Sequence, residues 1–206
     1  MNKQVYIMQL LMGLVAFILS GCSLFSPVDV KTPNKYILSE FPVFSPSERS
    51  QSTTLFVSEP ETRPIYNTVQ MAYMTQPHQI AFYRDNEWIE TPSQLLRPLI
   101  VKAIQKTRFF HAVVTPPYAG AYDYALSTHI LEFLQDFTTC PAMMRLTLKV
   151  QLMKGTTSQV IAIKEFTIRE PILQKTPYAG VIAANHATAA VLRQLVEFML
   201  DRAKYK

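Results

Sequence analysis

The clearest candidate for chemistry in this sequence is the thiol of Cys22, which directly follows Leu19, Ser20 and Gly21. A cysteine thiol becomes a strong nucleophile once deprotonated, so it can accept a transferred lipid group. Small residues before the break leave the backbone accessible to a processing peptidase. These four residues therefore predict acylation of Cys22 and cleavage immediately before it.

The segment before Cys22 has the three parts of a secretory signal peptide. Lys3 supplies a positive charge, an apolar run extends from Val5 to Leu19, and Ser20 and Gly21 precede the break. The apolar run is about 15 residues, whereas a permanent membrane span needs roughly 20. We therefore predict a signal peptide over residues 1–21, whose end is similar to a bacterial lipobox. A plain signal peptide followed by a chance cysteine is the alternative.

Lipid on Cys22 would hold the mature chain on a membrane. Each buried methylene adds about 0.8 kcal/mol of membrane affinity, so several acyl chains anchor a protein firmly. Ser23 follows the cysteine at the position where an aspartate favours retention in the inner membrane of Gram-negative bacteria. We expect a protein of the outer membrane that faces the periplasm, with the inner membrane as the less favoured alternative.

The other reactive side chains show no local pattern of a catalytic or metal site. None of the four histidines, His78, His111, His129 and His186, has a second ligand at HxxxH or CxxC spacing. Only five glycines occur, and both the Gly-x-Ser-x-Gly motif and phosphate-binding loops are missing. We expect no catalytic residue, no metal site and no cofactor. His129 lies in an apolar segment and is predicted to be a hydrogen-bonded core histidine.

The number of cysteines and the distribution of charge indicate which disulfide and binding partners the protein can have. Lipid on Cys22 would leave Cys140 without a partner in the chain, and we predict its burial beside Pro141, with an intermolecular bridge as the alternative. The net charge is +5, from 20 basic and 15 acidic residues, and the basic residues are scattered. This predicts a solvated surface and no nucleic-acid partner.

Composition predicts one domain behind an extended leader. Prolines and small polar residues mark residues 22–50 as the leader, with a short strand candidate at 35–38, and residues 51–206 as the domain. Alternation and β-forming residues predict further strands at 53–57, 68–74, 79–88, 109–114, 124–137, 143–152 and 160–169. The strand at 124–137 has a mixed pattern on both faces and is therefore expected in the middle of the sheet, covered on both sides.

Two helices are predicted. Thr91, Pro92 and Gln94 have the spacing of a capping box, although Pro98 in the following apolar run predicts a kink or a late start. A second apolar stripe, from about residue 180 to 204, predicts a long amphipathic helix. The fold class is therefore α+β, a largely antiparallel sheet backed by two amphipathic helices and preceded by a signal peptide and extended leader.

Aromatic side chains are more frequent in this domain than candidate catalytic or metal-binding side chains. The set comprises Phe82, Tyr83, Trp88, Phe109, Phe110, Tyr118, Tyr122, Tyr124, Phe133 and Phe137. Such side chains can line a lipid groove or a partner interface. They fill a hydrophobic core more often, and this is the prediction.

Several patterned segments agree with a known family. They are the strand at 80–84 with Trp88, the helix with Leu95, Leu96 and Leu99, the pairs at 109–110 and 113–114, the strand end at 131–133, and an alanine-rich C-terminal helix with Ala183, Ala184 and Ala187. In these features, over about residues 34–203, the chain resembles the ABC-type transport auxiliary lipoprotein family.

The resemblance implies a non-enzymatic, periplasm-facing component of an ABC-type intermembrane phospholipid transport system. Its expected partners are the membrane, through the anchor on Cys22, and an MCE-family or permease subunit, and homo-oligomers are left open. The ATPase would be another subunit, because no nucleotide motif occurs. The alternative is a structural or assembly lipoprotein of the envelope, such as a secretion or pilus accessory. An envelope hydrolase comes third.

Overall fold

The structure is a computed structural model that describes residues 3–19, 32–44 and 50–204. The chain divides into two compact units, Met1–Thr32 and Pro33–Lys206. In the first unit, α1 spans Lys3–Leu19, and the side chains of Val5, Tyr6 and Leu10 are exposed. None of the helices in the described ranges is both long and apolar enough to cross a membrane.

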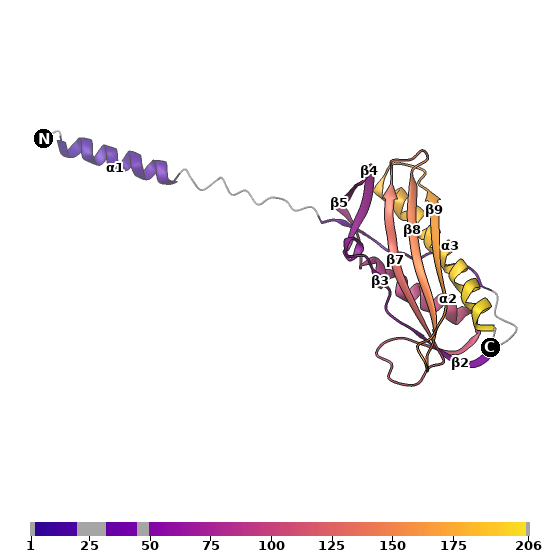
Figure 1. Cartoon of the computed structure of the whole chain (residues 1–206). Helices are drawn as coiled ribbons and strands as arrows, with labels where there is room; N and C mark the ends of the chain where they lie inside the picture. The colour runs from indigo at the N-terminus through magenta and orange to yellow at the C-terminus, as the bar shows by residue number, and fades with distance from the viewer. Residues whose placement is uncertain (1–2, 20–31, 45–49, 205–206) are drawn as a thin grey trace. The chain divides into compact units, whose positions relative to one another are not determined.

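Within the described residues, the second unit contains one mixed sheet of nine strands (Figure 1). The strands are β1 (Asn34–Tyr36), β2 (Gln51–Val57), β3 (Glu61–Thr62), β4 (Gln70–Gln76), β5 (Gln79–Trp88), β6 (Phe110–Val114), β7 (Tyr124–Asp136), β8 (Met143–Lys154) and β9 (Val160–Pro171). A 3-10 helix over Pro64–Tyr66 follows β3. The seven strands predicted within the domain are confirmed, with their ends within two residues of the predicted ones.

Strand β7 is the centre of the sheet, as the mixed pattern on both of its faces predicted. β2, β3 and β4 pair with it in parallel at successive positions, through Leu55 opposite Tyr124, Glu61 opposite His129, and Tyr73 opposite Gln135. β8 pairs with it in the antiparallel direction from residue 124 to 136. Because a strand has only two edges to pair, β2, β3 and β4 share one edge and β8 takes the other.

The long antiparallel pairs β7–β8 and β8–β9 agree with the predicted hairpin. Alternate residues of β8 are buried at 1% exposure or less: Met144, Leu146, Leu148, Val150 and Leu152. This is the pattern of a strand with one face on the core. The α+β class is confirmed, and the parallel pairs of β2, β3, β4 and β6 are additions that periodicity did not reveal.

Helix α2 spans Pro92–Lys106 and begins where the capping box predicted. The side-chain oxygen of Gln94 accepts the backbone N–H of Thr91 at 3.0 Å, which secures the first turn. The late start predicted from Pro98 does not occur, because this capped turn holds the helix from Pro92 onward.

Helix α3 spans Pro177–Lys204 and lies with α2 on the same side of the sheet (Figure 1). It packs on β8 and β9 and touches α2, which in turn packs on β6. The buried stripe of α3 includes Val181, Ala184, Val191, Leu192 and Leu195. Apolar side chains from the sheet and both helices therefore form one core.

Residues 34–44, which composition placed in the leader, pack on the domain instead. β1 pairs in parallel with β5, through Tyr36 opposite Trp88. Leu38 is 6% exposed, and Phe41 and Phe44 lie partly buried against the core. Burial of these apolar side chains stabilises the packed position of the segment, although its proline content is typical of an extended leader.

Candidate functional site

An aromatic pocket of about 370 Å³ opens where the β4–β5 hairpin meets the start of α3. Its lining residues are Tyr73, Thr75, Tyr83, Phe137, Lys175 and Pro177. Two tyrosine rings and a phenylalanine ring supply apolar area, and Lys175 supplies one positive charge. Such a lining suits an amphipathic or aromatic molecule.

One of the two tyrosines of this pocket, Tyr83, is held in place by the buried amide of Gln135, and its ring packs against Tyr73. The rings of Tyr73 and Tyr83 lie 4.4 Å apart between centroids. Tyr83 donates its hydroxyl hydrogen to Gln135 Oε1 at 3.0 Å. Burial, with a smaller contribution from Tyr73, raises the pKa of Tyr83 to about 12. The hydroxyl of Tyr83 therefore stays neutral and remains a hydrogen-bond donor at physiological pH.

Gly180 makes room for this arrangement. Gln135 also donates through Nε2 to the carbonyl of Pro177 at 3.4 Å, so its amide bridges β7 and the first turn of α3. A Cβ on Gly180 would overlap the side chain of Gln135. Only glycine at this helix position lets the amide reach both partners.

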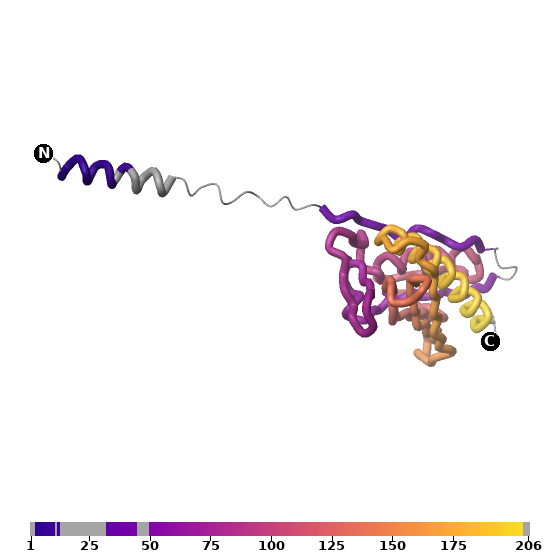
Figure 2. The backbone as a smooth tube through the Cα atoms, turned by 90° about the horizontal axis from the view of Figure 1, so that it is seen from above, coloured from indigo at the N-terminus to yellow at the C-terminus, as the bar shows by residue number. Residues whose placement is uncertain are grey.

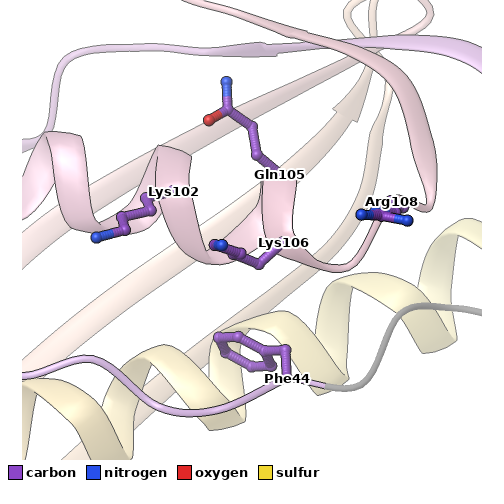
Figure 3. Close-up of a pocket in the computed structure, with 5 residues that line it drawn as sticks. All are labelled: Phe44, Lys102, Gln105, Lys106 and Arg108. Atoms are coloured by element: carbon purple, nitrogen blue, oxygen red, sulfur yellow. The ribbon is translucent and has the colours of Figure 1, made fainter.

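A basic cavity of about 460 Å³ lies between the end of α2 and the segment ending at Phe44. Figure 3 shows Lys102 and Lys106 on successive turns of α2, with Arg108 just beyond the helix. Gln105 completes the lining. Lys102 Nζ also lies 5.1 Å from the centroid of the Phe41 ring. The cavity could contact an anionic group. Its cationic side chains lie at the C-terminal end of α2, where they also interact favourably with the helix dipole.

A third hollow is an apolar groove of about 190 Å³ beside the first turns of α3. It is lined by Glu170, Pro171, Leu173, Ala179, Ile182, Ala183 and His186. The lining comes from the end of β9, the following loop and one side of α3. Glu170 and His186 form its polar rim.

His186 lies between two carboxylates that are distant in sequence. Its Nε2 lies 3.4 Å from Glu40 and its Nδ1 lies 3.3 Å from Glu170. The imidazole therefore joins the 37–44 segment to the end of β9. Among the described residues, no group of three or more His, Cys, Asp or Glu side chains is placed to hold a metal ion.

A second ionic group crosses the β7–β8 pair. Arg145 contacts both Glu132 and Asp136, and Thr147 donates its hydroxyl hydrogen to Glu132 at 2.8 Å. Burial alone would raise the pKa of Asp136, but hydrogen bonds from Thr138 and the charge of Arg145 outweigh it and lower that pKa. The side chain of Asp136 is only 6% exposed. This group fixes two strands to each other.

The residues predicted from sequence have mixed outcomes. Leu19 ends α1, while Ser20, Gly21 and Cys22 lie outside the described residues. The predicted burial of Cys140 is wrong: this residue is exposed. It lies in the short loop between β7 and β8, where its side chain is open to solvent.

The prediction for His129 is also wrong. Its side chain is 37% exposed and lies 3.4 Å from Glu61. The two residues are opposite each other in the β3–β7 pair, so the histidine faces a carboxylate at the surface. The sequence around His129 could not reveal this pairing, because its partner strand β3 is only two residues long and gives no recognisable strand pattern.

The aromatic residues divide between core, pocket and surface. The predicted core role is wrong for Tyr118, which is 39% exposed, and Phe82 and Tyr122 are only partly buried. The predicted core role is confirmed for Trp88, Phe109, Phe110, Tyr124 and Phe133. Tyr83 and Phe137 instead line the aromatic pocket, together with Tyr73. Sequence reasoning missed Lys175, whose aromatic pocket partners are distant in the chain, and the basic cavity, which forms only because Phe44 packs beside the end of α2.

Comparison with known proteins extends these observations. The chain matches the family model of the ABC-type transport auxiliary lipoprotein component over residues 36–196. No curated protein matches it. A crystal structure of a Xanthomonas campestris protein shares 20% identity at a TM-score of 0.76, and the alignment covers 83% of this chain and 97% of that one.

A second crystal structure, of an uncharacterized protein, shares 14% identity at a TM-score of 0.66. That alignment covers 82% of this chain and 99% of the other. At these identities the likeness concerns the fold, and it supports the α+β architecture described above. The family match spans most of Pro33–Lys206 and confirms the resemblance found in the sequence. The chain belongs to the ABC-type transport auxiliary lipoprotein family.

Proposed function

We propose that this protein is a non-enzymatic, periplasm-facing lipoprotein of an ABC-type intermembrane phospholipid transport system. Its direct partner would be an MCE-family or permease subunit. The observation that carries the proposal is the family match over residues 36–196, which covers strands β2 to β9, α2 and most of α3. A function in transport requires binding surfaces, and the part of the domain that the structure describes forms hollows of suitable chemistry.

The chemistry of these hollows supports an amphipathic cargo or partner. The aromatic pocket combines the rings of Tyr73 and Tyr83 with the ammonium group of Lys175. The basic cavity combines Phe44 with three cationic side chains. A phospholipid has acyl chains for the apolar area and a phosphate for the cations.

We further propose that residues 1–21 are removed and that Cys22 carries the lipid. Residues 23–32 would then join the anchor to the unit that begins at Pro33. Ser23 favours the outer membrane over the inner membrane. The anchor would place the domain at one end of a transport route across the periplasm.

Deletion of the gene tests this function. We expect increased sensitivity to detergent and more phospholipid in the outer leaflet of the outer membrane. The wild-type chain and Cys140→Ala should restore both properties, whereas Cys22→Ala should not, because only Cys22 would carry the lipid. Normal lipid asymmetry in the deletion strain, together with a loss of secretion or pilus assembly, would favour an assembly lipoprotein instead.

A further inference from the structure

Three large apolar side chains project from the surface at the start of α3. Leu173 is 90% exposed, Tyr178 is 61% exposed and Ile182 is 40% exposed. Tyr178 and Ile182 are four residues apart on α3 and therefore lie on one side of the helix. Leu173 and Ile182 both line the apolar groove. Clustered apolar exposure of this kind marks an interaction site, and we name these three residues the α3-start face.

The folded unit begins next to this face. The ring of Tyr36 lies 6.1 Å from the ring of Tyr178, centroid to centroid. Asn185 fixes the following residues, because its side chain accepts from the N–H groups of Ser39 and Glu40 and donates to the carbonyl of Ile37. Figure 2 shows the first residues of this unit running alongside α3. The point where the tether meets the domain is therefore fixed beside the α3-start face.

The surrounding side chains suit the headgroup region of a bilayer. Lys35 and Lys175 are exposed on the two segments that flank the face. Tyrosine favours the boundary between water and hydrocarbon, and lysine near an anionic lipid surface is attracted to it. The acidic residue of the groove, Glu170, faces His186 at 3.3 Å.

The length of the tether decides which surface this face would meet. From Cys22 to Pro33 the chain advances eleven positions, which span at most about 40 Å when fully extended. The end of the domain at Pro33 is thus confined near the anchored lipid, and confinement raises its effective concentration at the membrane surface. A free partner protein has no such advantage.

We propose that the α3-start face docks on the phospholipid bilayer that holds the lipid anchor. This proposal rests on the lipid-anchored function above. Leu173 and Ile182 enter the acyl boundary, Tyr178 lies at the level of the headgroups, and Lys35 and Lys175 contact phosphates. The domain would then have a fixed orientation, with α3 starting at the membrane.

Spin-label accessibility in the full mature lipoprotein tests the proposal. The protein is purified from membranes with Cys140→Ser, placed in nanodiscs of phosphatidylethanolamine and phosphatidylglycerol, and labelled with a nitroxide at Leu173→Cys. A matched control carries the label at Ile163→Cys, which is also an exposed apolar residue of the β9 region, at 53%. Ile163 lies eight positions before Pro171 on β9, about 26 Å along the strand.

We expect oxygen collisions to exceed collisions with a water-soluble nickel chelate at position 173, and the reverse at position 163. Equal access of the nickel chelate to both positions would overturn the docking proposal. So would spin–spin broadening at position 173 in nanodiscs that contain several protein copies, because a second copy would then cover the face.

The intact mass of the same sample separates the two proposals. A mass that includes acyl chains, together with a water-exposed label at position 173, rejects the docking face and leaves the anchored function intact. A mass without acyl chains rejects the anchor and, with it, the docking face.

Discussion

The side-chain oxygen of Asn185 accepts a hydrogen bond from the backbone N–H of Ser39 at 2.7 Å, across 146 positions of sequence. The same oxygen accepts from Glu40 at 3.0 Å, and the amide nitrogen donates to the carbonyl of Ile37 at 3.2 Å. Asn185 is 7% exposed. One buried amide on α3 therefore holds the beginning of the folded unit in an extended path.

Asn185→Ala should release this segment. Loss of these bonds leaves backbone groups without partners, and we expect unfolding free energy to fall by about 2–4 kcal/mol. Denaturant unfolding measures the loss, and hydrogen exchange should accelerate at Ser39 and Glu40. Gln194→Ala, at an exposed position of the same helix, should change stability by less than about 0.5 kcal/mol. Unchanged exchange at Ser39 and Glu40 in the Asn185 variant would contradict this role.

Gly180→Ala should destabilise the protein although alanine favours helices. Helix propensity alone predicts a gain of about 1 kcal/mol, but the new Cβ overlaps the buried side chain of Gln135. Overpacking of this kind costs about 1–3 kcal/mol. In a double-mutant cycle with Gln135→Ala, the combined loss should be smaller than the sum of the single losses. Additive losses would show that the two residues do not compete for space.

Ionisation of Asp136 should make part of the unfolding free energy depend on pH. Its pKa is lowered in the folded protein, so its contribution is complete above the unfolded pKa of about 3.9 and is lost as pH falls through the folded value. Asp136→Asn should cost about 2 kcal/mol at pH 7, because hydrogen bonds to a charged group are lost. Urea unfolding from pH 7 to pH 2 should show this difference shrinking below pH 4.

The exposed residue Asp85 provides the control for this titration. Asp85→Asn should alter stability by less than about 0.5 kcal/mol at every pH, since its side chain is at the surface. A difference between wild type and Asp136→Asn that stays constant down to pH 2 would show that ionisation of Asp136 does not contribute.

Thiol counting checks both the exposed position of Cys140 and the proposed lipid on Cys22. The folded protein purified from membranes should react with a maleimide at one thiol, and unfolding should reveal no second thiol. The reason is that Cys140 is exposed and a lipid thioether on Cys22 cannot react. In Cys140→Ser no labelling should remain. A second reactive thiol after unfolding would contradict acylation of Cys22.

Local signals in the sequence predicted the elements well. The capping box of Thr91 and Gln94 gave the start of α2, and alternation along residues 143–152 gave β8 and its buried face. These features depend on neighbours within a few residues. Of the two outcomes predicted from Pro98, a kink or a late start, the late start is wrong, because the capped helix begins at Pro92.

Pairing between distant segments could not be predicted. Nothing local in residues 51–76 shows that three short strands share one edge of β7, or that Asn185 fixes residues 37–40. The pocket around Tyr73 and Tyr83 depends on the same long-range arrangement, through Gln135. The aromatic composition therefore indicated which residue types could line a pocket, but not where in the fold the pocket would form.

The most direct test of the central claim is affinity purification of the lipid-anchored chain from detergent-solubilised envelopes, with quantitative mass spectrometry of the proteins that come with it. We predict enrichment of an MCE-family or permease subunit with the wild-type chain and with Cys140→Ala, relative to an unrelated lipoprotein. Repeated recovery of the intact, acylated chain without either subunit would contradict a role in lipid transport.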